Sequence, residues 1–168
     1  MQSVALTEKE IDRVGELLGR TPRGLEDVAV SGDAGEPLVV RVASLVDDKP
    51  FPTLFWLVCP VLNYRIDRLE AEGLIADLQA QIDSDLTLQE SMRADHLAHI
   101  RLREQHMSDE VLARIEQLGY QDVFTEKGIG GIGDFSRIRC LHTWYGAHLV
   151  VPNTVGRLLD DRWATEER

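Results

Sequence analysis

The sequence predicts an α+β fold, in which a small antiparallel sheet near the N-terminus is covered by several helices. Two observations indicate it. Short apolar runs separated by turn-forming residues occur only within residues 28–59, whereas apolar residues elsewhere recur at helical spacing. We expect one domain over residues 1–168, because 168 residues with 43% hydrophobic content suit a single core and no repeat or linker divides the chain.

The N-terminal third supplies one helix and the sheet. Thr7 and Glu10 form a capping box, and the apolar stripe that follows ends at Gly19. Three extended segments come next, at 28–30, 38–45 and 53–59, separated by the turn-rich stretches SGDAGE and DDKPFP. These short connections favour an antiparallel meander.

The remainder of the chain predicts helices. Pro60 suits the first turn of a helix that ends near Gly73. Helical periodicity then continues to about residue 118, with breaks near 83–86 and 107–108. Ser108 is placed to cap a helix that stops at Gly119. The last two helices are expected at 136–150 and 154–163.

Composition narrows the classes of function. A net charge of −11 argues against nonspecific binding to nucleic acid or to an anionic membrane. No apolar run approaches the roughly 20 residues that span a bilayer, and the start MQSVALTEKE lacks the features of a signal peptide. We therefore expect a cytoplasmic location, where Cys59 and Cys140 would be two free thiols.

The stretch GIGGIGDFSRIR, residues 128–139, is the most informative motif because it places four glycines ahead of a predicted helix. Glycines let a ligand approach the backbone, and a helix N-terminus attracts anions. We expect this loop and the arginines after it to bind phosphate or carboxylate. The residues concerned are Gly128, Gly130, Gly131, Gly133, Arg137 and Arg139.

A second candidate is a stripe on one face of a predicted helix. It consists of Met92, His96, His99, Arg103 and His106. Its imidazole and guanidinium groups suit an oxyanion, and His96 with His99 could bind a metal. The alternative is a solvated helix face on which Asp95 pairs with His99.

A third candidate is SRIRCLHTWYGAH, which contains Cys140, His142 and His148. On one helix Cys140 and His142 would lie about 200° apart, and Cys140 and His148 about 12 Å apart along the axis. Zinc needs its ligands within about 2.0–2.3 Å of one point. A single helix cannot satisfy this, so we assign no metal site. A mixed site with Cys59, one of Cys140 or His142, and the His96 stripe stays open.

If the protein is an enzyme, four residues are the catalytic candidates. His142 or His96 would be the acid or base, and Cys59 or Cys140 the nucleophile. His142 falls on the apolar side of its predicted helix, where a buried core histidine is the alternative. Cys59 precedes a predicted helix N-terminus, which can lower a thiol pKa, although a buried thiol is the commoner role.

Arg65 and Arg68 are interpreted as members of a solvated face. Their expected salt-bridge partners are Asp67, Glu70 and Glu72.

Several motifs carry a family resemblance. They are LGRTPRG at 18–24, KPFPTLFWLVCP at 49–60, RLEAEG at 68–73, His96 with Arg103, and GIGG followed by RIRCLH at 137–142. In these motifs the chain resembles a bacterial family known as domain of unknown function number five hundred and one. The resemblance covers residues 17–153 approximately. The resemblance implies no reaction and no cofactor. The resemblance also implies that many members have cysteines in the turn after the first strand. This chain has SGDAG there, and the departure argues against a cysteine-rich metal site.

The sequence thus favours binding, and possibly turnover, of a small phosphate-bearing anion where the glycine loop meets the His/Arg stripe. One alternative is a non-enzymatic module that docks a protein partner. Another is a metal-dependent hydrolase or redox protein, which needs at least three of the cysteines and histidines within a few ångströms. The sequence identifies no cofactor.

Overall fold

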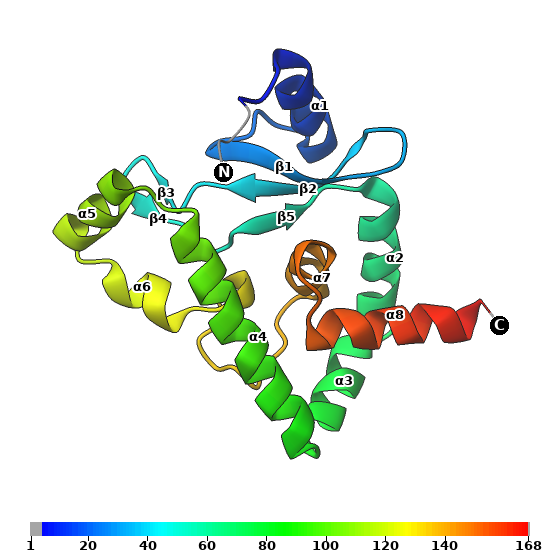
Figure 1. Cartoon of the computed structure of the whole chain (residues 1–168). Coiled ribbons are helices and arrows are strands. Elements are labelled where there is room, and N and C mark those ends of the chain that lie inside the picture. Colours follow the sequence, from blue (N-terminus) through cyan, green and yellow to red (C-terminus); the bar gives the residue numbers. More distant parts are fainter. Residues whose placement is uncertain (1–4, 168) are drawn as a thin grey trace.

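The computed structural model describes residues 5–167, so the first residues of the segment weighed above as a signal peptide lie outside the described range. The fold is α+β, as predicted (Figure 1). The strands are β1 (Leu25–Ser31), β2 (Pro37–Val42), β3 (Leu45–Val46), β4 (Lys49–Pro50) and β5 (Phe55–Leu57). The helices are α1 (Glu8–Leu18), α2 (Pro60–Ala71), α3 (Leu74–Asp83), α4 (Leu86–Gln105), α5 (Asp109–Leu118), α6 (Gln121–Glu126), the 3-10 turn η1 (Ile129–Gly131), α7 (Leu141–Val150) and α8 (Thr154–Glu166).

The main sheet has the order β1-β2-β5 with antiparallel neighbours, which confirms the predicted meander. β3 and β4 form a separate small ribbon within the connection between β2 and β5. Side chains alternate along β2: Val40 and Val42 pack with Val14 of α1, whereas Val39 joins the larger core around α7. The sheet is therefore covered on one face by α1 and on the other by α7 (Figure 1).

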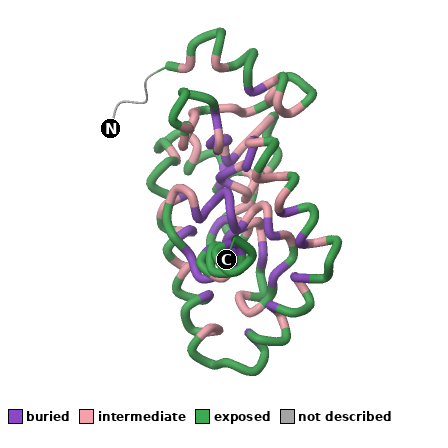
Figure 2. Tube along the Cα trace, turned by 90° about the vertical axis from the view of Figure 1, so that its right-hand side faces the viewer, coloured by how far each residue is buried: buried purple, intermediate pink, exposed green. Residues whose placement is uncertain are grey.

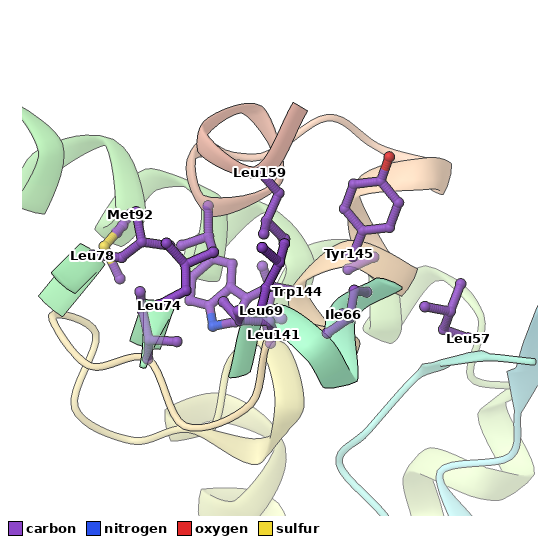
Figure 3. Close-up of a cluster of buried hydrophobic side chains, with 14 of the residues drawn as sticks. Leu57, Ile66, Leu69, Leu74, Leu78, Met92, Leu141, Trp144, Tyr145 and Leu159 are labelled. Atoms are coloured by element: carbon purple, nitrogen blue, oxygen red, sulfur yellow. The ribbon is translucent and has the colours of Figure 1, made fainter. Parts of the chain in front are cut away.

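The larger core is built around α7, which lies among α2, α4 and α8 beneath the sheet (Figure 1). Trp144 of α7 is fully buried and lies near Leu69 and Leu141 in the middle of the cluster (Figure 3). Tyr145 packs at the edge of this cluster and directs its hydroxyl away from it (Figure 3). Buried residues run through the middle of the molecule, and exposed ones form its outside (Figure 2).

Local signals explain most helix ends. The Thr7–Glu10 capping box forms as predicted, and Gly19 and Gly119 end their helices in the left-handed conformation. Asp85 caps α4 at the predicted break, by accepting from the N–H groups of Thr87 and Leu88. None of the helices within residues 5–167 has the length and hydropathy needed to cross a membrane.

The predicted helix at 136–150 is wrong over its first five residues, because α7 begins at Leu141. The segment before it is held by side chains in place of a helical ladder. Asp134 accepts from the N–H of Ser136 at 3.1 Å, and Gln79 of α3 accepts from the N–H of Ile138 at 2.9 Å. This short loop positions Cys140 at the start of α7.

Candidate functional site

Cys140 and His142 come together at the N-terminus of α7. Cys140 is the N-cap residue, with extended backbone angles of φ −152° and ψ 126°. Its Sγ lies 3.5 Å from Nδ1 of His142. The prediction that helical geometry keeps these side chains apart is therefore wrong, because it assumed that both residues lie within the helix.

Two carboxylates of α2 complete the cluster. Oε1 of Glu70 lies 3.4 Å from His142 Nδ1, and Oδ1 of Asp67 lies 3.1 Å from His142 Nε2. Asp67 and Glu70 are three positions apart, so they share the face of α2 that meets α7. The cluster named here the Cys140 site consists of Asp67, Glu70, Cys140 and His142.

The sequence interpretation of these carboxylates is corrected by the structure. They do not serve the neighbouring arginines of α2. Arg68 has its expected partner Glu72 at 3.7 Å, whereas Arg65 has Glu167 at 3.5 Å in place of the expected carboxylates. The spacing of Asp67 and Glu70 on one face was available in the sequence, but nothing in the sequence showed that this face meets α7.

The geometry of the Cys140 site suits a tetrahedral metal ion. Ligand atoms of Glu70, Cys140 and His142 all lie within 4.8 Å of one another. Zinc bonds of about 2.0–2.3 Å at tetrahedral angles separate neighbouring ligand atoms by roughly 3.3–3.6 Å. The distances of 3.5 Å and 3.4 Å from His142 Nδ1 agree with this. Asp67 holds the other ring nitrogen, as carboxylates commonly do for a metal-bound histidine.

The surroundings of the site shift the pKa values of its thiol and its imidazole in opposite directions. The hydrogen bond with Cys140 raises the pKa of His142 to about 9, against the effect of burial, and Glu70 and Asp67 add to the rise. Burial is the largest single influence and would raise the pKa of Cys140, but the hydrogen bonds with the His142 side chain and the Thr143 backbone, together with the charge of His142, outweigh it and lower the pKa. The thiol is therefore prepared to act as a ligand or as a nucleophile.

The site is accessible and borders a recess. The side chains of His142 and Glu70 are 24% and 26% exposed. His142 also lines a recess of about 280 Å3. Its other lining residues are Leu18, Thr53, Phe55, Trp56, Leu57 and Thr143.

Two kinds of chemistry fit these residues: metal binding, and nucleophilic attack by Cys140. Acyl transfer by a thiolate is helped by N–H donors near the nucleophile. The N–H of Leu141, the next residue in the chain, already donates to Glu70 Oε1 at 2.8 Å. A carboxylate beside the thiolate disfavours an anionic intermediate and favours a cation. The donor set therefore fits a metal ion better than a covalent nucleophile.

The glycine loop is an internal turn. The N–H groups of Gly128, Gly131 and Ile132 donate to carbonyls within the loop, and that of Ile129 donates to His96 Nδ1 at 3.0 Å. Gly128 is required there, since a Cβ would lie 2.2 Å from His96 Nδ1. The expectation that a helix directly follows the loop is wrong. Phosphate binding at this loop stays a prediction, but these four N–H groups are not free to serve it.

The stripe on α4 faces inward, apart from His106 at the helix end, so the solvated-face alternative is wrong. His96 is fully buried, stacks on Phe135 and contacts Trp144 edge-on. Burial lowers the pKa of His96 to about 4, and burial together with Arg103 lowers that of His99 to about 3. Both rings are neutral. Asp95 does not pair with His99 but accepts from the N–H of Thr154 at 2.7 Å.

Arg103 is a buried structural cation. Its guanidinium donates to the carbonyls of Pro52 at 2.8 Å, Phe124 at 2.5 Å and Lys127 at 2.7 Å. It forms no salt bridge with any residue in 5–167, and burial lowers its pKa to about 10. Arg103 thus ties α4 to the segments on either side, and the three donations to carbonyls are not available to an anion.

The remaining candidates lie apart from the Cys140 site. Arg137 faces Asp83 at 3.6 Å and Asp134 at 3.8 Å, and Arg139 is exposed. Cys59 is the N-cap of α2, as predicted, and is a free thiol like Cys140. Eleven residues separate Cys59 from Glu70 on α2, or about 16 Å along the helix axis. Among residues 5–167 the one group of three potential ligands close enough for a metal includes neither Cys59 nor a histidine of α4, so the mixed site is wrong.

His148 has a structural environment. Its Nε2 lies 2.9 Å from Oδ2 of Asp160, and its Nδ1 accepts from the N–H of Asn153 at 3.0 Å. Tyr145 donates to the other oxygen of Asp160 at 2.8 Å. These bonds join α7 to α8.

Comparison with known proteins gives a family without an assigned activity. The family described as "Protein of unknown function (DUF501)" matches residues 28–161, which is most of the chain. No curated protein and no solved structure matches.

Proposed function

The chain belongs to the DUF501 family, and we propose that it is a metal-dependent protein that holds one Zn²⁺ ion at Glu70, Cys140 and His142. The observation that carries the proposal is the convergence of three different ligand atoms within 4.8 Å, from two helices. Thiolate, imidazole and carboxylate are the three donors that zinc prefers.

Three protein ligands leave a fourth position for water, which is the arrangement of catalytic zinc sites. A zinc-bound water loses its proton near neutral pH and becomes a nucleophile. The recess of about 280 Å3 that His142 borders could receive the substrate, and its Phe55, Trp56 and Leu57 suit an apolar group. We therefore place the activity among metal-assisted hydrolyses. The site differs from the metal-dependent alternative of the sequence analysis, because it contains only two of those cysteines and histidines and takes its third ligand from Glu70.

Asp67 is the positioning residue of this site. Its contact with His142 Nε2 at 3.1 Å keeps a proton on that nitrogen and leaves Nδ1 to bind the ion. Cys140 is held at the helix start by the Thr143 hydroxyl, which donates to the Cys140 carbonyl at 3.1 Å.

The test is metal stoichiometry in the purified full-length protein. Chelator-treated protein is titrated with Zn²⁺ and separated from free ion, and bound zinc is measured by mass spectrometry. We expect about one ion per chain in the wild type and a large loss in Cys140→Ser, His142→Gln and Glu70→Gln. Cys59→Ser and Glu72→Gln are matched controls, because Cys59 and Glu72 lie outside the site. Equal zinc binding by Cys140→Ser and the wild type would overturn the proposal.

A further inference from the structure

A second site lies on the other side of Phe55, in a cavity of about 310 Å3 between α4 and the end of α7. This volume is at the small end of the range for ligand pockets. The lining includes neither Glu70, Cys140 nor His142, so the cavity is separate from the proposed metal centre. The apolar part of its buried lining comprises Phe55, Ile129 and Ala147, with Leu102 half-buried, and Val151 and Pro152 lie exposed at its edge.

His99 is the polar group that lacks a partner in this cavity. It lines the cavity, is only 6% exposed, and its Nε2 has no hydrogen-bond partner among the described residues. A buried polar atom without a partner destabilises the protein, because it has lost its hydrogen bonds to water. Asn153, another polar lining residue, is fully engaged, because it donates to the Trp144 carbonyl and accepts from the Gly156 N–H. A ligand in the cavity can therefore gain a bond at His99.

The rim adds a positive charge. Arg101 lines the cavity, is exposed, and has no salt bridge with any residue in 5–167. Asp95, the acidic residue of the lining, is engaged by the N–H of Thr154 at 2.7 Å. In a chain with a net charge of −11, Arg101 is a local positive charge at the mouth of the cavity. It favours a ligand with a carboxylate at its outer end.

We propose that this cavity binds a small aromatic or aliphatic carboxylic acid that carries a hydroxyl group at its inner end. The apolar body packs on the apolar lining, the hydroxyl reaches His99, and the carboxylate faces Arg101. A hydroxyl suits His99 because it can donate or accept, and so fits either neutral tautomer.

The first test is calorimetry with 4-hydroxyphenylacetate as the probe. Phenylacetate, which lacks the hydroxyl, should bind about fivefold more weakly. The amide 4-hydroxyphenylacetamide should bind two- to fivefold more weakly, as befits an exposed ion pair. No binding of the acid at millimolar concentration would overturn the proposal. An amide that binds as tightly as the acid would overturn the assignment to carboxylates.

Variants locate the binding. Ala98 is exposed and lines the cavity, so Ala98→Phe should block the mouth without disturbing the core and weaken binding at least tenfold. Ala94→Phe is the matched control, one turn earlier on α4, exposed and outside the lining. Arg101→Gln should weaken the acid two- to fivefold and leave the amide unchanged, whereas Arg93→Gln should change neither. Unchanged affinity in Ala98→Phe would show that the acid binds elsewhere and would overturn the proposal.

Discussion

The stripe on α4 and the Cys140 site contain similar side chains but differ in what surrounds them. Arg103 donates to three carbonyls, and His96 accepts from a backbone N–H, so these groups are used within the protein. At the Cys140 site the thiol, the imidazole and a carboxylate converge on each other at a half-buried position. A cation is the natural partner of such a set.

The contrast shows that the same residue types stabilise the fold or bind a ligand according to where their polar atoms point. The helical periodicity correctly predicted that the stripe lies on one face of α4, but that face packs against the core. The Cys140 site arises where a helix start meets the side of another helix. The predictions below test whether the first region is structural and the second is a ligand site.

The largest expected effect is the loss of the Arg103 hydrogen bonds. Arg103→Met leaves one buried and two partly buried carbonyls without their donor and should lower the free energy of unfolding by about 3–5 kcal/mol. Urea unfolding followed by circular dichroism measures it. Arg101→Met, exposed on the same helix, should change stability by no more than about 0.5 kcal/mol. Similar effects for the two variants would mean that Arg103 is not structural.

The next effect is a loss of stability at low pH, which we expect from the two buried neutral histidines, His96 and His99. Their pKa values are about 4 and about 3 when folded and 6.5 when unfolded, so below pH 6.5 only the unfolded chain takes up these protons. Their contribution is complete above pH 6.5 and falls as the pH falls toward 4. Between pH 6 and pH 5 the two histidines together should lower the free energy of unfolding by about 2.5 kcal/mol.

Unfolding free energies at several pH values measure this slope. His99→Gln should reduce it by about 1.2 kcal/mol per pH unit over the same range. A slope unchanged in that variant would show that His99 is not kept neutral by burial.

A smaller effect concerns the close contact of the glycine loop with α4. Gly128→Ala places a Cβ 2.2 Å from His96 Nδ1 and should destabilise the protein by about 2 kcal/mol. Gly15→Ala in α1 is the control, because its Cβ meets nothing closer than 3.5 Å and a helical alanine is favoured by about 0.5–1 kcal/mol. Thermal unfolding compares them, and equal melting temperatures would argue that the loop does not rest on His96.

The smallest effect should appear at Asp67. Asp67→Asn removes the charge next to His142 Nε2 and should weaken zinc binding about tenfold, with the stoichiometry kept. Competition with a chromophoric chelator measures the affinity. Asp77→Asn on the next helix is the control, since Asp77 lies outside the site. An unchanged zinc affinity in Asp67→Asn would show that Asp67 does not position His142 for metal binding.

Much of the fold could be predicted from sequence because its signals are local. The capping box at Thr7, the proline start of α2 and the glycine ends of α1 and α5 each depend on a few neighbouring residues. The start of α7 could not be predicted, because Gln79 of α3 holds Ile138 outside the helix. That contact joins residues 59 positions apart.

The candidate site was predicted in part. Cys140 and His142 were identified as candidates by residue type. They were not predicted to bind one metal ion together, because both were assumed to lie within one helix. Glu70 and Asp67 were assigned to a solvated face, because only the packing of α2 on α7 shows that they meet His142. The role of Arg103 was missed for the same reason, since its partners are backbone carbonyls that carry no sequence signal.

The most direct test of the central claim is X-ray absorption at the zinc edge of the reconstituted full-length protein. The account predicts one sulfur neighbour at about 2.3 Å, with the remaining ligands being nitrogen or oxygen at about 2.0–2.2 Å. The sulfur should be lost in Cys140→Ser and kept in Cys59→Ser. A spectrum with no sulfur neighbour in the wild type would contradict the metal centre at Cys140.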